Sequence, residues 1–201
     1  MTRRTLIAVI GDTHVDPESP KWQMAEELGK KLVDADYCIV NGGIGNMPRA
    51  ISIGAKQSSK YNGSSIIAIL PGFDPKIAEQ NADIIISTGI DHARNLIIAN
   101  SDAVIALGGG AGTLCEIAYA WELKRLILAF DLPGWSGQLA GKRIDERQRY
   151  PEIADDKVFK VTNCNQAVDL LKEKLHLYNA RHKGIAIKPE QDSSQKPRTV
   201  L

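Results

Sequence analysis

The sequence has almost no excess of charge and no long hydrophobic run. Its 25 Lys and Arg residues are balanced by 24 Asp and Glu residues, which leaves a formal net charge of +1. Since no long basic run occurs before the C-terminal tail, we expect no general affinity for nucleic acid or for anionic membranes. No apolar stretch approaches the length of a membrane span, and residues 1–4 lead directly into a predicted strand rather than a signal sequence. These absences favour a small molecule as the ligand.

Cysteine is also scarce, and Cys38, Cys115 and Cys164 are far apart. Their odd number and wide separation are typical of reduced thiols, and their spacing matches no metal site. We therefore expect a cytoplasmic protein with no metal site. We also expect no cofactor. The chain has no internal repeat, and its 201 residues, 43% of them hydrophobic, are enough for one domain with a substantial core.

Short apolar runs alternate with helical patterns along the chain. The runs are typical of buried strands, and the segments between them carry helix signals such as the cap residues Ser19 and Asn163. This order predicts an α/β domain with a mainly parallel sheet over residues 1–178, followed by a polar tail, residues 179–201, that we expect to be disordered. The predicted strands are 5–10, 37–40, 66–70, 83–87, 103–107, 126–130 and 158–162, and the predicted helices are 20–33, 48–57, 88–100, 112–123 and 163–175.

Two connections lack clear periodicity. Residues 74–83 are acidic and amide-rich, which predicts an exposed connection. Residues 132–157 form a longer stretch, and such a stretch is usually a lid or a mobile segment. Within it, Trp135 could stack on a flat heterocycle or pack the loop onto the body of the protein.

The predicted strand 103–107 runs directly into four glycines and a helix start. Backbone N–H groups at a helix N-terminus have no intrahelical partner, and the missing side chains let an anion approach, so this pattern predicts a phosphate cradle. Thr113 and Glu116 also fit a capping box, which would be purely structural. A Walker A loop and the dinucleotide fingerprint are excluded, because no lysine follows and Thr113 stands where the last glycine is required. The predicted cradle comprises Gly108, Gly109, Gly110, Ala111, Gly112 and Thr113.

Other predicted strands end at the same edge of the sheet, where ligands bind in open α/β folds. The first of them is followed by Gly11, Asp12 and Thr13, and then by His14, which could contact a ligand or be simply solvated. Asp131 could bind ribose hydroxyls or cap a turn. A second glycine-rich segment, the second glycine exit, follows the predicted strand 37–40 and contains Gly42, Gly43 and Gly45. It could be another backbone cradle or only a tight turn.

Three sequence motifs, taken together, resemble those of the LOG-like superfamily, once labelled "possible lysine decarboxylase". The resemblance covers roughly residues 5–130 and implies a Rossmann-like three-layer sandwich, a phosphorylated nucleotide-like ligand and a homodimer or higher homo-oligomer. In its best-known members it implies hydrolysis of a nucleoside 5′-monophosphate to the free base and ribose 5-phosphate. The motifs are Asn41-Gly42-Gly43-Ile44-Gly45, Asp91-His92-Ala93-Arg94-Asn95 and Gly108-Gly109-Gly110-Ala111-Gly112-Thr113-Leu114-Cys115-Glu116.

At two positions the chain differs from the LOG-like hydrolases and resembles a different branch of the superfamily. Those enzymes usually have Pro-Gly-Gly where this chain begins its glycine run at Gly108, and Arg-Lys where it has Arg94-Asn95. The branch with the triple glycine and Arg-Asn includes molybdenum-cofactor carrier proteins. The alternative to a hydrolase is therefore a non-catalytic carrier or sensor of a nucleotide or molybdopterin-type ligand, and a third option is a structural protein with an empty pocket.

The resemblance implies that Arg94 and Glu116 lie close together as the catalytic pair. An arginine can hold a phosphate through two parallel hydrogen bonds, although an isolated arginine is more often a surface ion-pair partner. A carboxylate beside the anomeric carbon can stabilise an oxocarbenium-like ribose, and we expect the nearby arginine to keep Glu116 ionised. Asn95 would contact the ligand where the enzymes have a lysine, which removes one positive charge from the site.

Overall fold

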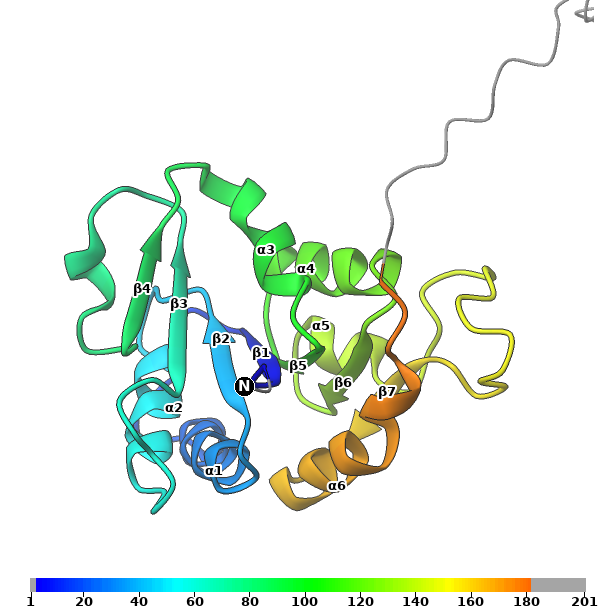
Figure 1. Ribbon diagram of the computed structural model, residues 1–201, viewed down its shortest axis with the longest axis horizontal. Coiled ribbons are helices and arrows are strands. Elements are labelled where there is room, and N and C mark those ends of the chain that lie inside the picture. Colours follow the sequence, from blue (N-terminus) through cyan, green and yellow to red (C-terminus); the bar gives the residue numbers. More distant parts are fainter. Residues whose placement is uncertain (1–2, 182–201) are drawn as a thin grey trace, which may run out of the picture.

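The computed structural model describes residues 3–181, which form one seven-stranded sheet covered by helices (Figure 1). All neighbouring strands are parallel, in the order β4-β3-β2-β1-β5-β6-β7, so the predicted α/β class with a parallel sheet is confirmed. Each predicted strand is present, with ends that differ by at most one residue. The strands are β1 Leu6–Gly11, β2 Cys38–Asn41, β3 Ile66–Leu70, β4 Ile84–Ser87, β5 Ala103–Leu107, β6 Leu126–Phe130 and β7 Val158–Val161.

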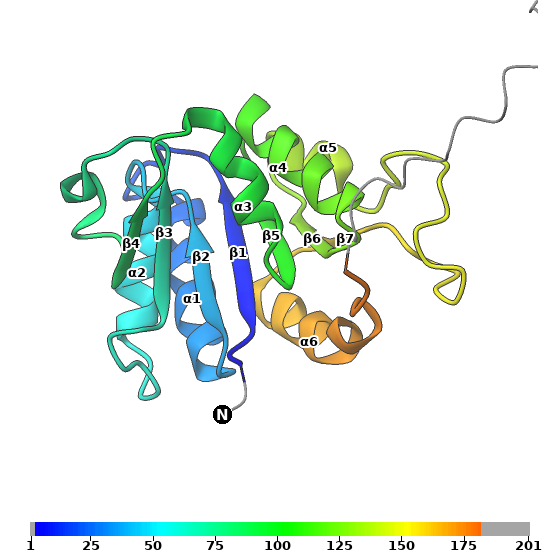
Figure 2. The ribbon, with the colours of Figure 1, turned by 45° about the horizontal axis from the view of Figure 1, so that its top comes forward.

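Helices lie on both faces of the sheet, which gives the Rossmann-like three-layer sandwich (Figure 2). One face is covered by α1 Pro20–Asp34, α2 Met47–Lys56 and α6 Cys164–Lys174, and the other by α3 Asn95–Ala99, α4 Ala111–Glu122 and α5 Trp135–Leu139. The predicted caps are confirmed, because Ser19 and Asn163 accept hydrogen bonds from Trp22 N and Gln166 N at the starts of α1 and α6. None of the helices between residues 3 and 181 is both long and apolar enough to cross a bilayer.

The predicted helix 88–100 is wrong in its first half. After a loop, the 3₁₀ helix η2 covers Asp91–Arg94 and only then does α3 begin. Gly89 and Asp91 adopt positive φ values of +67° and +51°, which a right-handed helix cannot contain. This break sets the position of Arg94 at the end of η2.

The connection 74–83 is only partly exposed. It contains the 3₁₀ helix η1 Pro75–Ala78, and Asn81 is buried with its amide group donating to the carbonyl oxygens of Gly43 and Gly45. The prediction of an exposed connection was therefore wrong at Asn81, because its amide supports the second glycine exit.

Residues 132–157 begin with α5 and are then fixed to the body by a buried ion pair. Arg149 donates to Asp156 through Nε (2.9 Å) and Nη2 (2.5 Å), and its guanidinium lies 3.7 Å from the centre of the Trp121 ring. This part of the expected lid is therefore a packed segment at the far end of α4. Of the predicted tail, residues 179–181 follow the 3₁₀ helix η3 Leu175–Leu177 and residues 182–201 lie outside the described part of the chain.

Candidate functional site

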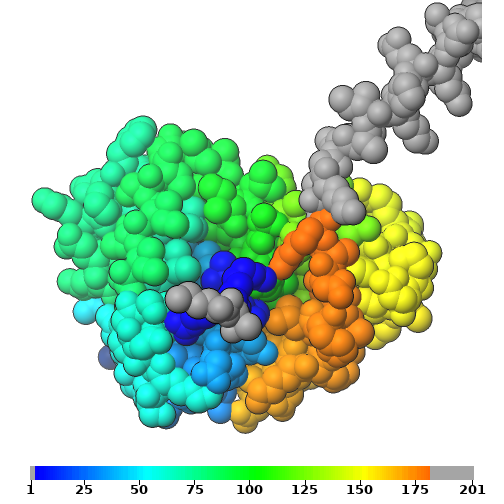
Figure 3. All heavy atoms as spheres, in the orientation of Figure 1, coloured from blue at the N-terminus to red at the C-terminus, as the bar shows by residue number. Residues whose placement is uncertain are grey.

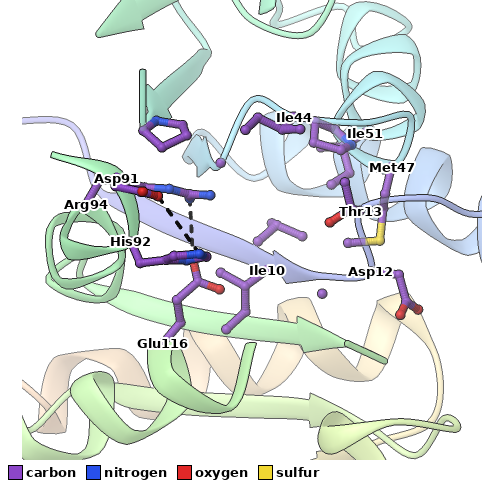
Figure 4. A pocket seen from close by; sticks show the side chains of 15 residues that line it. Ile10, Asp12, Thr13, Ile44, Met47, Ile51, Asp91, His92, Arg94 and Glu116 are labelled. Carbon is purple, nitrogen blue, oxygen red and sulfur yellow. Dashed lines mark ion pairs between the residues drawn. The ribbon is translucent and has the colours of Figure 1, made fainter. Parts of the chain in front are cut away.

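A pocket of about 340 Å³ opens at the carboxyl ends of the central strands (Figure 4). The exits of β1, β2 and β3 and the start of α2 form one part of its wall. The charged side chains come from η2 and α4 and, in the case of Asp12, from the exit of β1. Six of the predicted site residues therefore share one cavity, whereas the others lie elsewhere. The six are Gly11, Asp12, Thr13, Gly42, Arg94 and Glu116.

Arg94 and Glu116 face each other in this pocket, although 22 positions separate them in the sequence. Nη1 of Arg94 lies 3.6 Å from Oε1 of Glu116, and the two side chains are only 15% and 9% exposed. Among the described residues, Nε and Nη1 of Arg94 have no hydrogen-bond partner, although both atoms are buried. A buried cationic donor without a partner is costly, so this guanidinium is poised to bind an anionic or carbonyl-bearing ligand.

Burial changes the protonation of this pair. Burial raises the pKa of Glu116 to about 7, and the nearby Arg94 only partly opposes this rise. Burial also lowers the pKa of Arg94, against the opposite influence of Glu116. The expectation that Arg94 keeps Glu116 fully ionised is therefore wrong, because removal from water outweighs the attraction between the two groups. Near neutral pH, Glu116 can both hold and release a proton.

The capping-box interpretation of the same stretch is also wrong. Gly110 is the N-cap of α4, and no side chain of the described residues caps this helix. Thr113 Oγ1 instead donates to the carbonyl oxygen of Gly11. Thr113 thus ties the helix to the end of β1. Glu116 is free to point into the pocket rather than back to the helix start.

Part of the predicted phosphate cradle is already filled by the protein itself. The Gly108 amide donates to Ser136 Oγ (2.7 Å), and the Gly109 amide donates to Asp12 Oδ1 (3.1 Å). The other carboxylate oxygen of Asp12 pairs with Lys21 Nζ at 2.6 Å. Two of the predicted amides are therefore turned toward internal partners. Sequence reasoning missed Lys21, because nothing in its spacing links the first turn of α1 to the glycine run.

The glycines of the run differ in what surrounds them. A Cβ at Gly108 would lie 2.3 Å from Asp12 Oδ2, and one at Gly109 would lie 2.1 Å from Thr113 Oγ1. At Gly110 and Gly112 a Cβ would meet no atom within 4 Å in the part of the chain that the structure describes. Internal packing therefore explains the first two glycines. The open surface at the start of α4 lies at Gly110 and Gly112.

The second glycine exit supports Arg94 rather than forming another cradle. A Cβ at Gly42 would lie 2.6 Å from Arg94 Nη1, so a glycine leaves the room that the guanidinium occupies. Gly43 donates its amide to Asn41 Oδ1, and a Cβ at Gly45 would lie 1.9 Å from the carbonyl oxygen of Thr13. For Gly43 and Gly45, the tight-turn alternative fits the structure.

A second cavity, of about 470 Å³, adjoins the pocket and shares His92 with it. The predicted residues Asn95, Ala111 and Gly112 line this cavity, together with Cys115. Asp91 and His92 are pocket residues that sequence reasoning did not single out, although they belong to the same quoted motif as Arg94. The start of α4 therefore faces the neighbouring cavity rather than the pocket of Arg94.

Two further candidates lie away from both cavities. Asp131 pairs with Lys160 Nζ at 2.6 Å at the surface, and it lines neither cavity. His14 is exposed and also lines neither, as its solvated alternative predicts. Within residues 3–181, no three His, Cys, Asp or Glu side chains come together in a way that could hold a metal ion.

Comparison with known proteins gives consistent matches over most of the chain. The model of the SLOG cluster4 family matches residues 4–168. An uncharacterized protein of Archaeoglobus fulgidus is 39% identical over 128 residues, which cover 63% of this chain and 80% of that protein.

Two solved structures extend the comparison to the fold. The molybdenum cofactor binding protein from Rippkaea orientalis is similar with a TM-score of 0.67 and 26% identity, over 86% of this chain and 98% of that protein. TM1055 is similar with a TM-score of 0.70 and 22% identity, over 84% of this chain and 99% of that one.

Proposed function

Because the chain belongs to the SLOG cluster4 family, which confirms the resemblance to the LOG-like superfamily, we propose that it binds a phosphorylated nucleotide-like or pterin-like small molecule at the carboxyl edge of its sheet. The observation that carries this proposal is Arg94, a buried guanidinium with two donors unused, facing a buried carboxyl group across an open pocket. Such a pair can hold a polar, flat or sugar-like group in one orientation.

We place the ligand's phosphate at the start of α4. A Cβ atom added at Gly110 or at Gly112 would meet no atom of the described residues within 4 Å, which leaves the backbone accessible to a ligand. The helix dipole also favours an anion at that end. The Gly108 and Gly109 amides have internal partners and are left out of this assignment. Because His92 lines both cavities, a ligand that reaches from the start of α4 to Arg94 would pass beside it.

A carrier function is the first form of this proposal. The similarity to a molybdenum cofactor binding protein at 26% identity supports it. Asn95 is also neutral where the related hydrolases have lysine, so one cation fewer is available to stabilise a reacting phosphate ester. On this interpretation Arg94 and Glu116 hold the ligand by hydrogen bonds and no bond is broken.

Hydrolysis of a nucleoside 5′-monophosphate is the second candidate, and the pKa of Glu116 favours it. A carboxyl group with a pKa of about 7 is suited to give a proton to a leaving base and to take one from the attacking water. Arg94 would keep the ribose in register beside it. The products would be the free base and ribose 5-phosphate.

One experiment separates these candidates. The protein is incubated with a panel of nucleoside 5′-monophosphates, ribose 5-phosphate is measured, and binding is followed by calorimetry. Release of ribose 5-phosphate that is lost in E116Q would support the hydrolase, and binding without release would support the carrier. If none of the panel and no molybdopterin-type ligand bound, the proposed function would be wrong.

We also propose that two copies of the chain associate through an apolar face over β4 and α3. In the sheet register Ile84 and Ile86 of β4 pair with Ile67 and Ile69 of β3, so all four side chains point to the face that α3 and α4 cover farther along the sheet. No described helix covers this face at β4 (Figures 1 and 2). Large exposed apolar patches typically mark interaction sites. The face comprises Ile84, Ile86, Ile90, Leu96 and Ile97, each at least 42% exposed.

A further inference from the structure

A cluster of three arginines lies at the opposite edge of the sheet, where the central strands begin. Arg3 precedes β1, Arg125 precedes β6 and Arg181 follows η3, and all three surround Asp102, which precedes β5. They line a cavity of about 270 Å³. The cluster combines three guanidinium groups and one carboxylate, for a net charge of +2. Figure 3 shows the dark-blue start of the chain and the orange segment before residue 182 side by side on this surface.

The single carboxylate of the cluster is already fully engaged. Arg3 binds it through two parallel hydrogen bonds of 2.8 and 2.7 Å, the Leu6 amide donates at 2.9 Å, and Arg181 donates to the same group. Burial acts to raise the pKa of Asp102, but the hydrogen bonds from Arg3 and Leu6 outweigh it and the pKa is lowered. Asp102 is therefore ionised, and it balances only one of the three cations.

Among residues 3–181, Arg125 is the cation of the cluster that makes no ion pair. It is only 2% exposed, and it donates to two neutral acceptors, Asn100 Oδ1 at 2.6 Å and the Ala180 carbonyl oxygen at 3.2 Å. Within the described residues its Nε has no partner. Burial, and then repulsion from Arg181, lower the pKa of Arg125 to about 10. A buried charge that is paired only with neutral groups is unfavourable unless an anion is available.

Holding the chain end in place explains only part of this arrangement. The contacts of Arg125 with Ala180 and of Arg181 with Asp102 do tie the segment after η3 to the body. Holding the segment after η3 needs only one donor group for each acceptor that it binds. The cluster has two positive charges more than the carboxylate of Asp102 can neutralise. The excess positive charge surrounds a cavity rather than being dispersed over the surface.

We propose that this cavity is a binding site for a small polyvalent oxyanion, a phosphate or pyrophosphate group. The planar donor fork of arginine matches the oxygens of such groups, and three guanidinium groups from separate parts of the chain would enclose it. The cavity is smaller than the ~300 Å³ at which sites for larger organic ligands begin, which favours an ion or a terminal phosphate group.

The site is separate from the pocket of Arg94 and Glu116. The two lie at opposite ends of β1, whose six residues span about 20 Å at ~3.3 Å per residue. One anion cannot contact both sites. The proposal is therefore independent of the function assigned to the other edge.

Calorimetric titration of the full chain with inorganic pyrophosphate at low ionic strength tests the proposal. We expect binding that weakens roughly tenfold or more in R3A and in R181A, because each removes charge-assisted hydrogen bonds. Arg3 and Arg181 are 64% and 45% exposed, so both variants are expected to fold. The matched control is R4A, which makes the same charge change one position away, where Arg4 bonds Ser64 and does not line the cavity. R4A is expected to change the affinity less than about twofold.

Three results would overturn the proposal. The wild-type chain could give no binding heat with pyrophosphate. R3A and R4A could weaken binding equally, which would indicate a diffuse surface attraction rather than a site. Binding could also vanish in R94M while R3A and R181A leave it unchanged, which would place the anion at the carboxyl edge. Because Arg94 lies at the other edge of the sheet, we expect R94M to leave unchanged the part of the binding that R3A and R181A weaken.

Discussion

Replacement of Glu116 by glutamine should change how the stability of the protein depends on pH. Burial raises the pKa of this carboxyl group from 4.5 in the unfolded chain to about 7. The folded state then holds the proton more tightly than the unfolded state does. The contribution of Glu116 to the free energy of unfolding is therefore highest below pH 4.5, falls as the pH rises from 4.5 toward 7, and levels off above that range.

The magnitude follows from the size of the shift. At 1.36 kcal/mol for each pKa unit, the wild type loses up to about 3 kcal/mol relative to a chain whose residue 116 stays neutral. E116Q keeps the shape of the side chain and cannot ionise. We therefore expect the difference in stability between E116Q and the wild type to grow by about 2 to 3 kcal/mol between pH 5 and pH 8.

Urea unfolding at pH 5, 6, 7 and 8 measures this difference. Because all other groups titrate in both proteins, their contributions cancel in the comparison. The control is E18Q, which removes the same charge at an exposed position. If the advantage of E116Q stayed constant within about 0.5 kcal/mol over this range, the carboxyl group would be well solvated and the argument for proton transfer by Glu116 would fail.

Three further predictions concern the ligand and the partner copy. G112A should raise the free energy of unfolding by about 0.5–1 kcal/mol, because alanine favours a helix, yet weaken binding of adenosine 5′-monophosphate roughly tenfold in calorimetry. G72A, another glycine with open space around it, should leave that affinity unchanged, and equal affinities of G112A and wild type would place the phosphate elsewhere. G42A should weaken binding of adenosine 5′-monophosphate, because its methyl group would lie 2.6 Å from Arg94 Nη1 and would displace the guanidinium. Melting curves should show that G42A is folded, and an unaltered affinity would argue against Arg94 as a ligand contact. I86K should lower the mass measured by light scattering to that of one chain, whereas I53K, on the opposite helical layer, should not; a monomeric wild type would refute the association.

The centre of the sheet could be predicted closely because strands such as β5 and β6 are buried on both faces. Ile66–Leu70 and Ala103–Leu107 are continuous apolar runs between turn residues, and both were predicted with their observed ends. The helix expected over 88–100 failed because its apolar spacing continues through Gly89 and Asp91, whose positive φ values depend on contacts that the local sequence does not reveal.

The site was predictable only through the resemblance. No spacing rule places Arg94 beside Glu116, and the local pattern at Glu116 favoured a capping box as strongly as a ligand site. The internal use of the Gly109 amide by Asp12 joins positions 97 residues apart, so it follows from the tertiary structure alone. Burial of Glu116 likewise depends on that structure, and this is why its expected ionisation was wrong.

The ion pair of Asp12 with Lys21 packs so closely against Gly108 that a larger residue would not fit there. Selection for a well-packed interior is enough to preserve the first half of the run, whether or not any ligand is bound. A descendant that had lost its ligand would keep Gly108 and Gly109 and would be free to replace Gly110 and Gly112. The latter two positions, and not the glycine run as a whole, would record whether binding has been retained.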